Sequence, residues 1–169
     1  MFRTARSEDI DRLHQLLIAE AQEGRFERRL AEEPYRSAMR RNLNNIRKRG
    51  RRLDEDLEAQ LLVWEHDGVL AGCVINSAIL PGAGNEIWAI AVLAQARGEG
   101  VGSAISAHLV DALHPRVDLY ARCAPKAQVA CEMFLRRGFL PLDVTEHGVQ
   151  IAPDTDNGMG PMYIARVSK

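Results

Sequence analysis

The sequence predicts one α/β domain with a mixed central β-sheet of about seven strands, flanked by about four helices. Three observations support this fold class. Short apolar segments of strand type alternate along the chain with segments of helical spacing. An Asp67-Gly68 turn between two apolar runs is a strong signal for a β-hairpin. Residues 86–103 pass from an apolar run through closely spaced glycines into a helical pattern, which indicates a strand, a loop and the start of a helix.

Length and composition narrow the class of protein. The 169 residues suffice for one domain with its own core and are too few for two ordinary domains, so we expect residues 1–169 to form a single domain. A formal net charge of −1 argues against a nucleic-acid-binding protein or one that binds anionic membranes. The sequence has no signal-peptide pattern and no run that approaches the ~20 apolar residues of a membrane span. We therefore expect a cytoplasmic protein whose partners are small molecules.

The three cysteines are Cys73, Cys123 and Cys131. Their number and spacing suit neither a disulfide framework nor a zinc site. We expect free thiols that pack as small apolar side chains in a reducing cytosol, and no metal site.

The first third of the chain is expected to be largely helical. Residues 2–5 can form a short strand, after which Ser7 caps a helix whose apolar stripe continues to Gly24. Residues 26–57 are charged and helix-prone. Their basic run, residues 40–52, is typical of a solvated face, but it can also pair with the acidic residues that follow it or contact an acidic surface or a ribose phosphate.

The remaining elements follow from periodicity and turn signals. A hairpin of residues 61–66 and 69–75 precedes the central strand, and a helix from Val101 ends before Pro115. The later elements are a strand at residues 117–122, a helix at 127–134 that stops at Gly138, and two final strands at 139–144 and 162–167.

The glycine loop between the central strand and its helix carries the chemistry. Glycines at a helix start leave backbone N–H groups unpaired and let a phosphate approach the backbone closely, so a phosphorylated ligand is expected. Two well-known motifs fit poorly. The dinucleotide-binding fingerprint requires a third glycine where Ser103 stands, and the chain lacks the Gly-Lys-Ser/Thr triplet of a P-loop. A dinucleotide-dependent oxidoreductase is therefore disfavoured.

Two segments carry a resemblance to a known family. Arg97-Gly-Glu-Gly100-Val-Gly102 begins five residues after Val92, at the end of an Ile-Ala-Val strand. It resembles the pyrophosphate loop, Arg/Gln-x-x-Gly-x-Gly/Ala, of the GNAT superfamily of acyl-CoA-dependent N-acetyltransferases. Residues 130–139, which end in Gly138-Phe139, resemble a second family segment that ends in Gly-Phe. The two regions cover roughly a third of the chain, and the order of elements agrees with the family.

The resemblance implies transfer of an acetyl group from acetyl-CoA directly to a primary amine of a small molecule or peptide. It implies that the pantetheine arm binds the backbone of Ile90, Ala91 and Val92, and that the Val92 N–H stabilises the oxyanion. The pyrophosphate would lie on the backbone of Arg97, Gly98, Gly100, Val101, Gly102 and Ser103.

Glu86 is the predicted general base. An alkyl ammonium has a pKa near ~10, so a group must remove its proton before the nitrogen can attack a thioester. The resembled family often has a carboxylate six residues before the last apolar residue of the central strand. Glu86 stands six residues before Val92.

The second segment departs from the family in two places. Ala127 stands where an Asn often touches the cofactor, and Phe134 stands where a Tyr commonly protonates the departing thiolate. By resemblance, Phe134 lies near the cofactor's sulfur but cannot donate a proton. Water can donate it instead, or one of three side chains: Cys123, Cys131 or Tyr120. The missing hydroxyl favours one alternative function, a non-catalytic acyl-CoA-binding sensor or regulatory module.

The acceptor is the least determined part. In the resembled family, the first helices and the last loop build its site. Here these regions carry Glu32, Glu33, Asp154 and Asp156, so we expect a cationic amine. The sequence does not determine the oligomeric state, and a homodimer is one of the states it allows.

Overall fold

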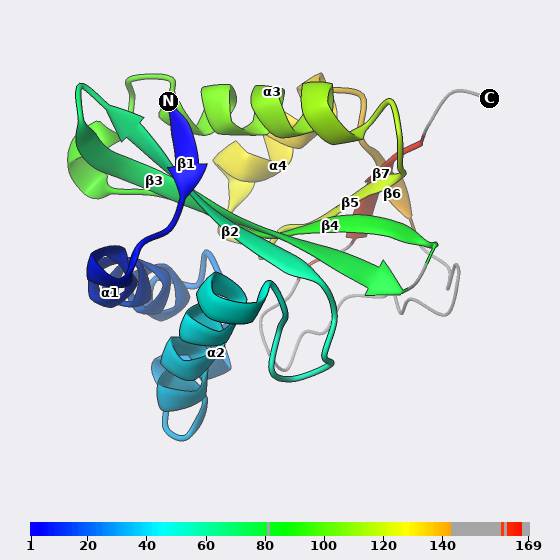
Figure 1. Ribbon diagram of the computed structural model, residues 1–169. Coiled ribbons are helices and arrows are strands. Elements are labelled where there is room, and N and C mark those ends of the chain that lie inside the picture. The colour runs from blue at the N-terminus through cyan, green and yellow to red at the C-terminus, as the bar shows by residue number, and fades with distance from the viewer. Residues whose placement is uncertain (81, 143–159, 161, 167–169) are drawn as a thin grey trace.

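A mixed seven-stranded β-sheet, in the order β1-β2-β3-β4-β5-β7-β6, carries helices on both faces (Figure 1). The computed structural model describes residues 1–80, 82–142, 160 and 162–166. The strands are β1 (Phe2–Thr4), β2 (Ala59–His66), β3 (Val69–Leu80), β4 (Gly84–Val92), β5 (Leu119–Arg122), β6 (Leu140–Leu142) and β7 (Met162–Ala165). The helices are α1 (Ile10–Gln22), α2 (Tyr35–Arg49), α3 (Val101–Leu113) and α4 (Gln128–Arg136), with short 3-10 turns η1 (Ser7–Asp9), η2 (Arg28–Ala31) and η3 (Ala94–Ala96).

This architecture confirms the predicted α/β fold with a mixed sheet. The Asp67-Gly68 hairpin joins β2 to β3, and β3 continues five residues beyond the predicted strand end at residue 75. The helix-prone stretch, residues 26–57, contains only one long helix, because Gly50 adopts a left-handed conformation with a φ of 67° and ends α2 there. Of the predicted final strands, residues 143, 144 and 167 lie outside the described residues.

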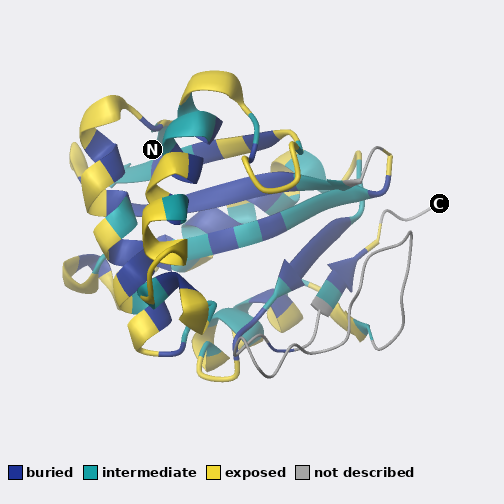
Figure 2. Cartoon of the chain, turned by 90° about the horizontal axis from the view of Figure 1, so that it is seen from below, coloured by how far each residue is buried: buried dark blue, intermediate teal, exposed yellow. Residues whose placement is uncertain are grey.

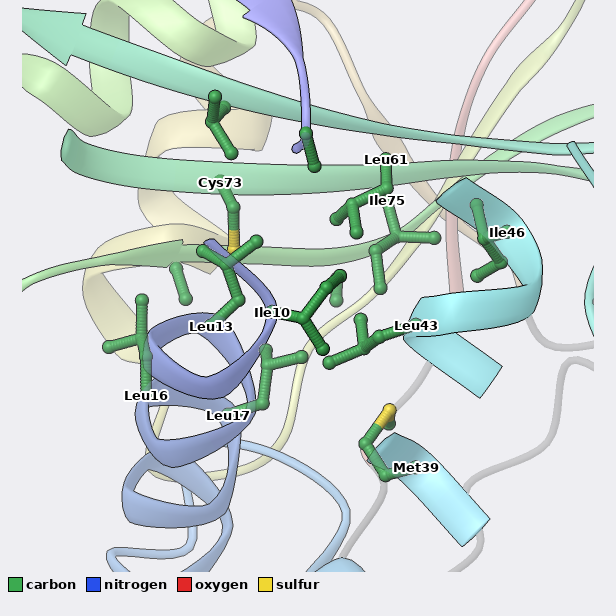
Figure 3. Close-up of a cluster of buried hydrophobic side chains, with 14 of the residues drawn as sticks. Ile10, Leu13, Leu16, Leu17, Met39, Leu43, Ile46, Leu61, Cys73 and Ile75 are labelled. Atoms are coloured by element: carbon green, nitrogen blue, oxygen red, sulfur yellow. The ribbon is translucent and has the colours of Figure 1, made fainter. Parts of the chain in front are cut away.

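Apolar side chains fill the space on both sides of the sheet. Helices α1 and α2 cover one face, and α3 and α4 cover the other. In Figure 2 the central strands are mostly buried, whereas each helix exposes its outer side. Figure 3 shows ten labelled side chains of the core under α1 and α2: Ile10, Leu13, Leu16, Leu17, Met39, Leu43, Ile46, Leu61, Cys73 and Ile75.

Three arginines of the basic run, residues 40–52, pair with carboxylates. Arg40 binds Asp11 of α1, Arg51 binds Asp56 with 2.8 Å between Nε and Oδ1, and the buried Arg52 binds Asp54. Of the alternatives that the sequence left open, pairing with the adjacent acidic residues is therefore the one observed for Arg51 and Arg52.

Among the described residues, none of the helices combines the length and the apolar character that a membrane crossing requires.

The two central strands β4 and β5 run parallel but stay paired only briefly. Their register covers residues 85–87 of β4 and 119–121 of β5. Against β3, Ile87 pairs with Asn76 and Ala89 pairs with Ile75, so Trp88 is one extra residue, a β-bulge, in β4. A bulge bends its strand and increases the local twist. Beyond Trp88, β4 continues along β3 to Val92, while no strand of the described residues pairs with its other edge.

Candidate active site

A pocket of about 770 Å³ lies between the end of β4, the loop that leads into α3, and α4 with the segment before it. This volume is in the range of sites that bind small molecules and cofactors. Residues of β4 and of the glycine loop line it: Ile90, Ala91, Val92, Ala96, Arg97, Gly98, Gly100, Val101, Gly102 and Ser103. The rest of the wall is formed by Glu20, Arg25, Lys126, Ala127, Val129, Ala130, Met133, Arg136 and Arg137.

The unpaired edge of β4 directs backbone groups into this pocket. The Leu93 N–H donates to the Ala71 carbonyl at 2.9 Å, and bonded and non-bonded pairs alternate along an antiparallel ladder. This alternation turns the N–H and C=O of Ala91 toward β3 and those of Ile90 and Val92 toward the open edge. Of the three residues predicted to bind pantetheine through the backbone, Ile90 and Val92 have the required orientation, and Ala91 contributes only to the wall.

The glycine loop is shaped to let a ligand approach its backbone. Gly98 and Gly100 have φ values of 83° and 77°, and a Cβ at either position would meet no atom within 4 Å, so the space beside both is open. Gly100 is the N-cap of α3 and has no side chain with which to cap the helix. The N–H groups of the first turn, residues 101–103, therefore remain available to an anion.

The charge of the pocket wall is predominantly positive. Among its residues, five are basic and one, Glu20, is acidic; the basic residues are Arg25, Arg97, Lys126, Arg136 and Arg137. Such a wall suits a ligand with several negative charges, because the cationic side chains attract it and reduce the cost of bringing its phosphates together. The donor set on this wall therefore fits the phosphates of CoA.

Glu20 links two of these guanidinium groups. It accepts from Nε and Nη2 of Arg25 at 2.8 and 2.9 Å, and it also binds Nη2 of Arg97. Burial raises the pKa of the Glu20 carboxyl, but the bonds and charges of Arg25 and Arg97 outweigh burial and lower the pKa below its usual value. Arg97 further donates from Nε to the Val92 carbonyl at 3.1 Å. No sequence pattern singles out Glu20, because its partner Arg97 lies 77 residues away in the chain.

Glu86 lies where β4 and β5 are still paired, beside the point at which they separate. It pairs with Tyr120 of β5 and with Ser77 of β3. Its side chain is half-buried, and it is outside the wall of the pocket. Burial raises the pKa of the Glu86 carboxyl, although the positive charges of Arg122 and Arg52 oppose the rise. A raised pKa makes this carboxylate a stronger base than an exposed glutamate.

Phe134 does not line the pocket, contrary to its predicted place beside the cofactor's sulfur. Its side chain is only 2% exposed and packs against Phe139, with 5.1 Å between ring centroids. The residues of α4 that reach the wall are its neighbours, such as Ala130 and Met133. The helix period explains the difference for Met133, which lies about 100° around α4 from Phe134 and so reaches the wall while Phe134 is directed into the core.

The other predicted proton donors also lie away from the pocket wall. Cys123 and Tyr120 are buried, and burial raises the pKa of the Cys123 thiol to about 12. Cys131 contacts Tyr163, and this hydrogen bond raises the pKa of the Tyr163 hydroxyl to about 12. All three cysteines are free thiols, as expected. In the described part of the chain, no three metal-ligating side chains come together.

The predicted acidic acceptor entrance is only partly described. Asp154 and Asp156 lie outside the described residues. Glu33 accepts the Ser37 N–H at 3.2 Å in the first turn of α2, and neither it nor Glu32 lines the pocket. Preference for a cationic amine therefore stays a prediction.

Comparison with known proteins decides the family. The model of the acetyltransferase (GNAT) family matches residues 11–139, well over half of the chain. The protein belongs to the GNAT acetyltransferase family. No curated protein matches the chain.

Several solved structures share the fold of this GNAT protein. An N-acetyltransferase from Staphylococcus aureus Mu50 aligns with a TM-score of 0.66 at 17% identity, over 98% of this chain and 100% of the other. A ribosomal-protein-alanine N-acetyltransferase from Brucella melitensis aligns with 0.68 at 16% identity, over 98% and 99%. A putative acetyltransferase from Salmonella typhimurium, solved with its cofactor acetyl-CoA, aligns with 0.66 at 13% identity, over 100% and 94%. At these identities the likeness shows the fold alone.

Proposed function

We propose that this GNAT protein is an N-acetyltransferase that moves an acetyl group from acetyl-CoA directly to a primary amine of a small molecule or peptide. One observation carries the proposal: the open glycine loop at the start of α3 faces a pocket whose wall has five basic side chains and one carboxylate. The Salmonella relative, solved with acetyl-CoA, supports the choice of donor. The Brucella relative is named for a protein acceptor, which supports keeping peptides among the acceptors.

The pocket divides into parts that suit successive groups of acetyl-CoA. The N–H groups of residues 98–103 bind the pyrophosphate, with Arg97 beside them. The backbone of Ile90 and Val92 binds the pantetheine arm as a further strand would bind β4. This arrangement places the thioester near the point where β4 and β5 separate.

The reaction needs a base and an oxyanion donor. The Glu86 carboxylate takes a proton from the acceptor's ammonium, directly or through water. The free amine nitrogen then forms a bond to the acetyl carbonyl carbon, the carbon–sulfur bond breaks, and CoA leaves as its thiolate. The Val92 N–H, which is directed toward the open edge of β4, stabilises the negative charge on the carbonyl oxygen. A thiol of pKa near ~8.5 leaves without an acid on the protein, so the buried Phe134 does not prevent turnover.

The Glu86→Gln variant tests this assignment. It keeps the shape of the side chain but removes the base, so turnover should fall by roughly 10² to 10⁴ while acetyl-CoA affinity stays unchanged. Since the pKa of Glu86 is raised, wild-type turnover should decline as the pH falls through that pKa. CoA release measured across pH, with calorimetry of acetyl-CoA binding, checks both expectations. Glu58→Gln removes an equal charge from an exposed residue before β2 and serves as the control. Full activity of Glu86→Gln at neutral pH would rule out this base.

An acyl-CoA sensor is the second candidate, favoured by the position of Phe134. That residue lacks a hydroxyl and lies in the core, so α4 supplies no tyrosine to the pocket wall. A panel of primary amines, assayed for CoA release, separates the two functions. Binding of acetyl-CoA without CoA release for any amine would favour the sensor.

A further inference from the structure

Arg137, at the end of α4, is fixed against the first two turns of α3. Its Nε donates to the buried Ser106 hydroxyl at 2.8 Å, and its Nη2 donates to the carbonyl and the hydroxyl of Ser103 at 2.8 and 3.0 Å. Among the residues that the structure describes, no carboxylate pairs with Arg137. No described carboxylate therefore offsets its positive charge, and the guanidinium has a fixed position on the pocket wall.

The balance of charge sets Arg137 apart from the other arginines on the wall. Arg25 and Arg97 share the carboxylate of Glu20, and Arg136 pairs with Glu132 at 3.1 Å. Arg137, by contrast, binds only neutral groups of α3, the side chains of Ser103 and Ser106 and the Ser103 carbonyl. Its positive charge is therefore left for an anion that binds in the pocket.

The position of Arg137 along α3 indicates which anion it binds. This step rests on the proposed function, in which the pyrophosphate occupies the N–H groups at the start of α3. Ser106 lies five residues after Val101, roughly 7 Å further along the helix axis. The guanidinium therefore extends from Ser103, at the edge of the pyrophosphate position, to Ser106 beyond it. CoA carries a third phosphate on the 3′ carbon of its ribose, which can lie beside the pyrophosphate.

We propose that Arg137 binds the 3′-phosphate of CoA and makes the protein select CoA thioesters over their 3′-dephospho forms. Arginine suits this role because, with Nε and Nη2 bound to the two serines, Nη1 can still donate to a phosphate from a fixed position. The sequence alone could not assign this role, since Ser103 and Ser106 lie more than 30 residues before Arg137.

Calorimetry with two ligands and matched variants tests the proposal. Acetyl-CoA and acetyl-3′-dephospho-CoA are titrated into the wild type, Arg137→Gln and Arg116→Gln. Arg137→Gln should weaken acetyl-CoA binding by about tenfold or more and change dephospho-ligand binding by less than about twofold. The wild type should prefer acetyl-CoA by the same factor. Arg116→Gln removes an equal charge from an exposed residue beyond the other end of α3 and should bind both ligands like the wild type.

Four results would overturn the proposal. If Arg137→Gln weakens binding of both ligands equally, Arg137 either only holds α4 against α3 or contacts the pyrophosphate. Unchanged binding of acetyl-CoA would mean that it contacts no phosphate. If the wild type binds acetyl-CoA and acetyl-3′-dephospho-CoA with equal affinity, only the 3′-phosphate assignment is overturned. If it binds neither ligand, the proposed function is overturned as well. If Arg137→Gln does not fold, Arg137→Lys keeps the charge but cannot bind both serines and a phosphate in the same geometry, and it should weaken only acetyl-CoA, by about three- to tenfold.

Discussion

At the scale of single residues, Asp9 joins the first strand to the first helix. Its carboxylate accepts from two nitrogens of Arg3, at 2.6 and 3.1 Å, and from the backbone N–H of Arg6 at 2.7 Å. Arg3 also donates to Glu65 of β2 at 2.6 Å. The hydrogen bond from Arg3 is the largest influence on the pKa of Asp9 and lowers it, although burial opposes the shift.

Asp9→Asn should destabilise the protein most at neutral pH. The variant leaves the half-buried Arg3 guanidinium without its carboxylate partner, so we expect a loss of about 1–3 kcal/mol in the free energy of unfolding at pH 7. Because the folded pKa is lowered, the contribution of Asp9 is complete above the unfolded value and disappears as the pH falls through the folded pKa. Urea denaturation at pH 7 and pH 3 measures this, and the stabilities of wild type and variant should converge at the lower pH. Asp11→Asn, at an exposed site, is the control. A difference that stays constant with pH would contradict the charge-based explanation.

At the scale of elements, the sequence predicted the glycine loop because each of its signals is local. The apolar strand, the glycines and the helical pattern follow one another within residues 86–103, and the structure has β4, the loop and α3 in that order. The bulge at Trp88 was not predictable in this way. It exists only relative to the register with β3, and register depends on residues distant in sequence. The same limit applies to Phe134, because periodicity identifies an apolar face of α4 but not the part of the molecule that it contacts.

Gly100 tests the loop as a phosphate site. Gly100→Ala and Gly100→Glu both place a side chain at a left-handed position, which costs about 1–2 kcal/mol of stability. Only the glutamate adds bulk and negative charge in the open space beside the loop. We therefore expect Gly100→Glu to abolish acetyl-CoA binding in calorimetry and Gly100→Ala to weaken it much less, with melting curves showing similar stability. If the folded Gly100→Glu variant binds as the wild type does, the phosphate lies elsewhere.

At the scale of the whole molecule, residues from both faces of the sheet line the pocket. Glu20 and Arg25 come from the end of α1 and the turn after it, on one face, whereas Ala130, Met133 and Arg137 come from α4 and its end, on the other. These segments meet at the pocket because β4 and β5 separate beyond Trp88. Sequence patterns predicted the strands and helices individually, but the meeting of α1 with α4 depends on that separation. This is why the loop residues were predicted and Glu20, Arg25 and Arg137 were not.

A ligand that contacts segments from both faces of the sheet should stabilise the folded chain as a whole. Binding to the folded state alone adds about 2.7 kcal/mol when free acetyl-CoA is at 100 times its Kd. For a chain of this length, that corresponds to a rise in Tm of about 5–10 °C. Thermal denaturation with increasing acetyl-CoA measures it, and Tm should increase with the logarithm of ligand concentration. NAD at the same concentration is the control, since it resembles the nucleotide portion of CoA but has no pantetheine arm to pair with β4. An equal rise in Tm with NAD would show that the pocket recognises only a nucleotide pyrophosphate. If Tm does not rise with acetyl-CoA in the millimolar range, the assignment of the pocket to CoA is wrong.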